Sequence, residues 1–255
     1  MTDAHIEGQD LDTLPQDVRE DTELTKLHCW LNQLTELPLS PKLTELYCQD
    51  NLLTELPPFP KLTDLDCSNN QLTELPLFPK LTELYCWHNQ LTELPLFPEV
   101  TSLSCTRNRL TELPLFPEVT RIHCGSNQLT ELPLFPKLTT LYCQNNQLTE
   151  LPLFPKLTEL DCIDNQLTRL PMLPKLTMID CERNQLTELP LFPELIYLRC
   201  QDNPLEVLPY YPKLIEIDLT GCPVASLMAD PTDVEEYHRL WKKQIENRKK
   251  SARSY

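Results

Sequence analysis

The chain repeats one pattern of apolar and polar positions every 19 residues for most of its length. One copy begins at Leu81 and reads LTELYCWHNQLTELPLFPE through Glu99. From Leu81 to Cys86 the pattern alternates, which predicts a short strand that turns Leu81, Leu84 and Cys86 toward the core. A fixed short period is typical of a solenoid, in which each copy packs mainly on its two neighbours.

The second half of each copy contains two prolines, such as Pro95 and Pro98. Proline restricts φ and removes a backbone donor, so we expect an extended or polyproline-like return segment instead of a helix. All seven phenylalanines fall in one column of the repeat, which predicts that they belong to the core. Without helices on the outer side, the curvature of the solenoid should be modest.

Cysteines and asparagines mark the repeat ten times without an insertion or deletion. Stacked on parallel strands, neighbouring cysteines would lie about 4.8 Å apart with parallel side chains, whereas a disulfide needs Cβ atoms turned toward each other. We therefore expect reduced core thiols, and asparagines bonded to the backbone where the chain leaves each strand. In the last copy, Leu219 stands at the cysteine position and Cys222 stands at the asparagine position. We expect Cys222 to be structural. The cysteines are Cys29, Cys48, Cys67, Cys86, Cys105, Cys124, Cys143, Cys162, Cys181 and Cys200, each followed three residues later by asparagine.

The repeat divides the chain into three parts. Residues 1–23 precede the regular ladder and contain Leu11 and Leu14 in an echo of the repeat, so we expect a degenerate turn that caps the core. Residues 24–229 predict about eleven turns, each with one short parallel strand. Residues 230–255 predict a capping α-helix followed by a basic tail.

The C-terminal part carries both a helix signal and a charge signal. Asp230 and Pro231 are typical of an N-cap followed by proline at the first helical position. The apolar residues that follow are spaced as on one face of an amphipathic helix: Val234, Tyr237, Trp241 and Ile245. We expect this helix to cap the solenoid by packing on Leu227 and the last turn. The alternative is a partner-binding or address segment, to which the basic run of residues 248–250 and 253 would contribute.

The phrase L-x-x-L-x-C-x-x-N-x-L-x-x-L-P-x-x-P resembles the short, proline-containing leucine-rich repeats of secreted bacterial effectors that act inside host cells. It is also similar to repeats encoded by giant viruses of amoebae. The resemblance covers roughly residues 11–229 and implies a leucine-rich repeat solenoid. Some of those effectors carry a large C-terminal ubiquitin-ligase domain with a catalytic cysteine. The 26 residues after the repeats contain no cysteine, so that activity is not carried over.

The net charge of −16 argues against a general nucleic-acid binder, because phosphate binding requires Lys and Arg. The sequence shows no signal peptide, no membrane span and no Asn-x-Ser/Thr acceptor. With the reduced thiols, these features predict an intracellular protein in a reducing compartment, in the cytoplasm of a cell or host cell or in the nucleus. The repeated glutamates suggest calcium, but they lack the closed loop of oxygens that calcium needs, and a solvated edge is preferred.

The positions that vary between copies predict a binding face. They flank the cysteines, point outward and should line the concave side of the sheet. Exposed Trp, Tyr and Arg are the residues that most often dominate interface energy, whereas neutral drift on a solvated face favours small polar residues. The predicted partner-binding residues are Trp30, Tyr47, Tyr85, Trp87, His88, Arg107, Arg109, Arg121, His123 and Tyr142. The C-terminal third of the face is acidic.

These observations favour a non-catalytic module that binds another protein on its concave face. We expect no catalytic residues, cofactor or metal, because the chain has only three glycines, its histidines are scattered and its cysteines point inward. One alternative is a structural component of a larger particle. Another is an acidic chaperone for basic proteins, since residues 1–229 carry a net charge of −18. Association through the open ends of the solenoid is compatible with all three.

Overall fold

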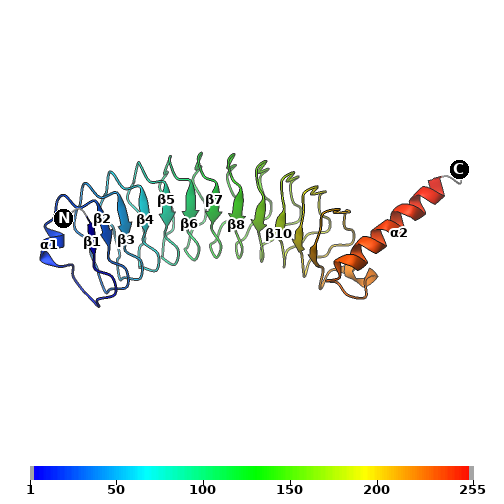
Figure 1. The fold of residues 1–255 in the computed structure, drawn as a ribbon, viewed down its shortest axis with the longest axis horizontal. Helices are drawn as coiled ribbons and strands as arrows, with labels where there is room; N and C mark the ends of the chain where they lie inside the picture. The colour runs from blue at the N-terminus through cyan, green and yellow to red at the C-terminus, as the bar shows by residue number, and fades with distance from the viewer. Residues whose placement is uncertain (1–2, 253–255) are drawn as a thin grey trace.

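The protein is a stack of short turns that forms one twelve-stranded parallel sheet, with strands in chain order (Figure 1). The computed structural model describes residues 3–252, and side chains through residue 243. Ile245 and the basic tail predicted above therefore lie outside the described side chains. The strands are β1 (Asp3–His5), β2 (Lys26–His28), β3 (Glu45–Tyr47), β4 (Asp64–Asp66), β5 (Glu83–Tyr85), β6 (Ser102–Ser104), β7 (Arg121–His123), β8 (Thr140–Tyr142), β9 (Glu159–Asp161), β10 (Met178–Asp180), β11 (Tyr197–Arg199) and β12 (Glu216–Asp218).

Each strand is only three residues long, so the strand expected over residues 81–86 is reduced to β5. The central residue, Leu84, is buried, while Glu83 and Tyr85 face outward. Backbone pairing continues past the strand, since the Cys86 amide donates to the Ser104 carbonyl at 2.8 Å. All eleven cysteines are free and buried, as the spacing predicted. Burial raises the pKa of Cys29 to about 12, so this thiol is a poor nucleophile.

Asparagine and threonine ladders connect successive turns. Asn51 Nδ2 donates to the carbonyls of Cys29 and Cys48, at 2.9 and 3.0 Å, and its Oδ1 accepts from the Leu34 amide at 2.9 Å. This confirms the predicted role of asparagine and satisfies backbone groups that would otherwise be buried without partners. Thr63 Oγ1 donates to the Thr44 carbonyl at 3.0 Å, and the same bond recurs in neighbouring turns. The Cys222 thiol takes the asparagine role in the last turn, 3.0 Å from the Cys200 carbonyl.

The residue before each asparagine has a left-handed backbone. Arg107, for example, has φ of 56° and His88 has φ of 56°. Asn, Asp and Gly tolerate this region best, which explains why they fill this column in six turns. The column varies in sequence, but the backbone restricts which residues it tolerates. Its members are Leu31, Asp50, Asn69, His88, Arg107, Ser126, Asn145, Asp164, Arg183, Asp202 and Gly221.

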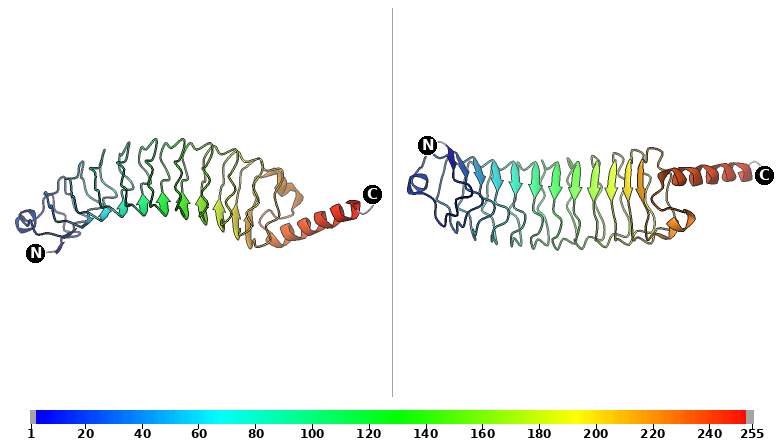
Figure 2. Two further views of the ribbon diagram at one scale, coloured as in Figure 1. Left: turned by 90° about the horizontal axis from the view of Figure 1, so that it is seen from above. Right: turned by 60° about the horizontal axis from the view of Figure 1, so that its bottom comes forward.

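The phenylalanine column forms the outer layer of the core and sets the curvature. Phe59 and Phe78 stack at 6.3 Å between ring centroids, and Phe97 and Phe116 stack at 6.5 Å. Parallel strands are only about 4.8 Å apart, so the turns are more widely spaced on the phenylalanine side. The solenoid therefore bends gently, with its sheet along the inner side of the arc (Figure 2).

The N-terminal segment contributes a complete turn. The strand β1 was not predicted, because its parallel pairing joins Asp3 to Lys26 over 23 residues instead of 19. The Gln9 and Leu11 amides donate to Asn32 Oδ1 at 3.1 and 3.0 Å, as in a regular turn. A short helix, α1 (Gln16–Arg19), follows and buries Val18 over the end of the core.

The C-terminal segment contains a 3₁₀ helix, η1 (Pro223–Leu227), and the helix α2 (Val234–Ala252), which projects from the end of the solenoid (Figure 1). The predicted N-cap, Asp230, is wrong. Asp233 Oδ1 accepts from the Glu236 amide at 2.9 Å and caps α2, whereas Asp230 bonds Thr232 within the preceding loop. The helix cap lies three residues later than predicted because the Asp230 side chain is already bonded to Thr232 in the loop.

The start of α2 packs on the last turn, as predicted. Tyr237 is buried, and its hydroxyl donates to the Pro209 carbonyl at 2.7 Å. Trp241 Nε1 donates to the Leu208 carbonyl at 3.1 Å. Leu227, the predicted contact, stays 59% exposed. The helix therefore caps the last turn mainly through aromatic side chains bonded to backbone carbonyls.

Candidate functional site

The inner face of the sheet presents the predicted binding residues toward solvent. In most turns the third residue of the strand and the second residue after it point outward, while the cysteine between them is buried; Ser68 and Gly125 are buried exceptions. Trp87 is 37% exposed even though it lies next to the core. The exposed members of the predicted set are Trp87, His88, Arg107, Arg109 and Arg121. The half-buried members are Trp30, Tyr47, Tyr85, His123 and Tyr142.

Parallel register brings several of these rings together. His123 and Tyr142 end neighbouring strands, β7 and β8, and their rings stack with centroids 4.5 Å apart. Trp87 and His88 are stacked nearly parallel, at 6.3 Å. Burial lowers the pKa of His123, which favours the neutral ring in this contact. The face therefore carries flat, preorganised aromatic surfaces instead of mobile side chains.

The three arginines of the predicted set lie at different places relative to the strands. Arg121 lies at the start of β7, and Arg107 lies in the turn after β6. Arg109 follows the buried Asn108, and its amide donates to the Leu91 carbonyl where the chain has already left the sheet. Arg109 therefore lies at the edge of the inner face, beyond its strand columns.

The acidic end of the face is shaped by burial and ion pairs. Desolvation raises the pKa of Asp180 to about 6, and it also raises the pKa of Asp161 one turn earlier. Arg199 forms an ion pair with Glu216, with Nη2 and Oε1 2.7 Å apart. This guanidinium is thus bonded to Glu216 and makes no ion pair with Asp180 or Asp161 among the described residues.

Sequence reasoning missed a row of exposed apolar side chains on the return segments, here called the leucine stripe. Its residues follow the first proline in eight of the return segments. These segments lie on the outer side of the arc, opposite the sheet (Figure 2). Their recurrence at the 19-residue period was a signal that could have been used. The stripe consists of Leu39, Leu77, Leu96, Leu115, Leu134, Leu153, Met172 and Leu191, each at least 50% exposed.

Sequence reasoning also missed the meeting of His5, Glu7 and His28. The histidine ring centroids are 4.4 Å apart, and His28 in turn contacts Tyr47 at 4.8 Å. Burial lowers the pKa of His28. The 23-residue offset of the first turn hid this cluster, because the 19-residue ruler does not align His5 with His28.

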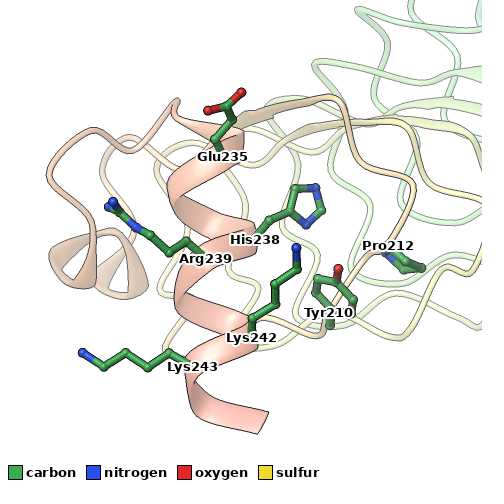
Figure 3. A pocket seen from close by; sticks show the side chains of 7 residues that line it. All are labelled: Tyr210, Pro212, Glu235, His238, Arg239, Lys242 and Lys243. Carbon is green, nitrogen blue, oxygen red and sulfur yellow. The ribbon is translucent and has the colours of Figure 1, made fainter. Parts of the chain in front are cut away.

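A pocket lies between α2 and the last turn, lined partly by basic side chains (Figure 3). Arg239, Lys242 and Lys243 all line it; Lys242 extends on the side of Tyr210, while Arg239 and Lys243 extend on the other side of the helix in this view. His238 turns toward the solenoid, where its Nε2 donates to the Leu214 carbonyl at 3.0 Å. This histidine is therefore part of the cap and is already bonded to the backbone. Among the described residues, no helix is long and apolar enough to cross a membrane.

Comparison with known proteins defines the class. A family described as "Leucine Rich repeats (2 copies)" matches residues 41–80, 60–98 and 117–155. The chain is 32% identical to YopM, a leucine-rich effector protein from Yersinia pestis, covering 86% of this chain and 71% of that one, with a TM-score of 0.76. The chain belongs to the leucine-rich repeat family.

Two other solved structures extend the likeness. YopM from Yersinia enterocolitica WA-314 is 37% identical over 79% of this chain and 47% of its own, with a TM-score of 0.75. The functional domain of InlJ from Listeria monocytogenes, described as including a cysteine ladder, is 34% identical over 87% of this chain and 54% of its own, with a TM-score of 0.82. The chain thus spans about half the length of these two. No curated protein matches the sequence significantly. Leucine-rich repeats typically serve as non-catalytic protein-interaction modules.

Proposed function

We propose that this chain binds another protein along the concave face of its sheet and performs no catalysis itself. The observation that carries the proposal is the exposure of large aromatic surfaces on that face. Trp87 is 37% exposed and stacks only on its neighbour His88, while Tyr85 stands beside it at the end of β5. Rigid aromatic groups lose little conformational entropy on binding, which makes them effective anchors.

Backbone strain supports the same assignment. Arg107 and Leu31 occupy a left-handed position at which Asn, Asp or Gly would cost less. Strained residues of this kind cluster at functional sites. Arg107 is exposed, so its side chain gains no compensating burial within the chain. The exposed guanidinium is thus free to recognise an acidic group of the partner.

The face would bind in two chemically distinct zones. The first, around Tyr85 and Trp87, offers apolar and aromatic contacts. The second, around Asp161 and Asp180, is negative and suits a basic segment of the partner. This second zone also supports the alternative of an acidic chaperone, which would depend mainly on charge. A reducing compartment is part of the proposal, because the chain holds eleven free cysteines.

The proposal is tested by capturing partners from a eukaryotic cell lysate with wild type and with the variant Tyr85→Ala plus Trp87→Ala. The matched control is Leu77→Ala plus Leu96→Ala, which removes apolar side chains from the leucine stripe near the same turns. We expect the concave variant to lose the partner and the control to retain it. Loss in the control alone would move the interface to the outer side.

Salt dependence distinguishes the alternatives. Exposed charges are screened within about 10 Å at 0.1 M salt, so an acidic chaperone would release its partner steeply as salt rises. An aromatic interface would keep its partner as salt rises. A partner retained by both variants within a particle of defined size would favour a structural role. Association through the ends of the solenoid would appear as a concentration-dependent mass in the absence of any partner.

A further inference from the structure

Three side chains that commonly bind transition metals meet at the N-terminal end of the concave face. His5 ends β1 and His28 ends β2, and the two residues are directly paired in the sheet. Glu7 follows two residues after His5. One ligand atom from each of the three lies within 4.8 Å of the others. They come from two different turns, so only the fold brings them together.

We propose that His5, Glu7 and His28 bind one zinc ion, or a similar first-row divalent cation, with an open coordination position toward the concave face. Two histidines and one glutamate form a recurrent zinc-binding set in which the fourth position is left for water or another ligand. Imidazole nitrogen also selects zinc, nickel and copper over calcium or magnesium, which prefer oxygen ligands.

The distances require only small side-chain adjustments. Glu7 Oε1 lies 3.2 Å from His5 Nδ1 and 3.8 Å from His28 Nδ1. Ligands about 2.0–2.2 Å from a tetrahedral ion are separated by roughly 3.3–3.6 Å. A small rotation of the partly exposed Glu7 side chain closes the wider distance, between Glu7 and His28. The pocket is thus already near the required size.

The surroundings leave the three groups available. His28 Nε2 is buried without a hydrogen-bond partner in the described part of the chain, so the metal would bind His28 through Nδ1, the nitrogen that faces Glu7. Tyr47 packs against the same ring and limits its rotation. The nearby ammonium group of Lys26 is 2.8 Å from Glu45 Oε1, so Lys26 is engaged away from Glu7.

A metal bound here would affect both the N-terminal cap and the concave face. The first turn is joined to the second by short backbone contacts, such as Ile6 N to His28 O at 2.9 Å and Gly8 N to Trp30 O at 3.0 Å. A metal bound to both turns would fasten them further. The open position would adjoin Trp30 and Tyr47, so a histidine, cysteine or carboxylate from a partner could complete the coordination. The metal site does not depend on the proposed function.

The test is zinc and cobalt titration of reduced protein without a histidine tag. We expect one ion per chain, the intense visible absorption of four-coordinate cobalt, and a higher melting temperature with zinc. Glu7→Gln and His5→Ala should each weaken binding by about a hundredfold or more, because they remove a direct ligand and loss of an outer-shell partner alone costs roughly 10–100-fold. His123→Gln, which removes a histidine from the same column of the face, should bind as wild type.

Separate controls test whether the variants still fold and whether cysteine binds the metal. His5 is exposed, so His5→Ala should keep the circular dichroism spectrum and the metal-free melting temperature of wild type. The proposal is overturned if zinc at millimolar concentration neither binds nor stabilises the protein, or if Glu7→Gln binds as tightly as wild type. A thiolate-to-cobalt charge-transfer band would also overturn it, because it would assign the metal to cysteine.

Discussion

The side-chain amide of Asn146 donates to the carbonyl of Cys124, which lies one turn earlier in the solenoid, at 3.1 Å. The same nitrogen donates to Cys143 within its own turn at 3.0 Å, and Asn146 Oδ1 accepts from the Leu129 amide at 3.0 Å. One side chain thus satisfies buried backbone groups in two turns. Since each turn depends on its neighbours for stability, this bond couples their folding.

Replacing Asn146 with alanine should therefore destabilise the protein by about 3 kcal/mol or more, because a buried group left unpaired costs roughly 1–3 kcal/mol and three are affected. Its neighbour Asn145 is exposed and provides a matched control. Asn145→Ala should cost only about 1 kcal/mol, from the left-handed backbone. Urea denaturation measures both values. Equal losses would contradict the coupling role of Asn146.

Arg107→Asn should stabilise the fold by about 0.5–1 kcal/mol, because asparagine tolerates the left-handed conformation that arginine adopts there. The reciprocal change Asn145→Arg, at the equivalent position, should destabilise by a similar amount. Thermal and urea unfolding measure both. If Arg107 also contacts the partner, Arg107→Asn should bind more weakly while melting at a higher temperature. A less stable variant would show that Arg107 is not strained.

Because of Asp180, we expect the stability of the folded protein to decrease as pH rises from about 4 to about 6. Burial raises its pKa in the folded state to about 6, above the ordinary value of 3.8. The folded state therefore holds this proton more tightly than the unfolded state, and stability decreases as pH rises through that window. Asp180→Asn should remove this pH dependence. The stability of the variant relative to wild type should therefore be higher at neutral pH than at pH 4. Urea denaturation at several pH values tests this, with the exposed Glu188→Gln as the control for charge.

Tyr237→Phe should loosen the C-terminal cap. The hydroxyl donates to the Pro209 carbonyl and accepts from the Tyr211 amide at 2.9 Å. Phenylalanine preserves the ring packing but leaves that buried amide unpaired, at a cost of about 1–3 kcal/mol. Hydrogen exchange should accelerate at Tyr211 and in the last turn, while the central turns keep their protection. Tyr210→Phe, on the same interface, should leave exchange at Tyr211 unchanged.

Much of the architecture could be predicted from the residues alone. The alternation around Leu84 and Cys86 predicted an inward strand face, and the prolines predicted a return segment without helix. Both follow from local rules that repeat in every turn, so each copy independently supports the assignment. Strand length was overestimated, because the alternation reports which side chains are buried and does not report where regular pairing ends.

The candidate binding face could be predicted only in outline. Its outward columns followed from the repeat, but the position of Arg109 beyond the sheet did not. The left-handed backbone before each asparagine was also hidden, although the frequent Asn and Asp in that column were a visible trace of it. The start of α2 was misplaced because Asp230 and Asp233 are both plausible caps by sequence, and only the loop geometry distinguishes them.

The sequence by itself determined the period, the inward and outward positions, and the free core thiols, since these depend on each residue's place within a repeat. Only the tertiary structure decided the curvature, which follows from the spacing of stacked phenylalanines against that of the strands. It also decided that His5, Glu7 and His28 meet. Their contact depends on how an irregular 23-residue turn registers with its neighbour, and backbone pairing across turns sets that register.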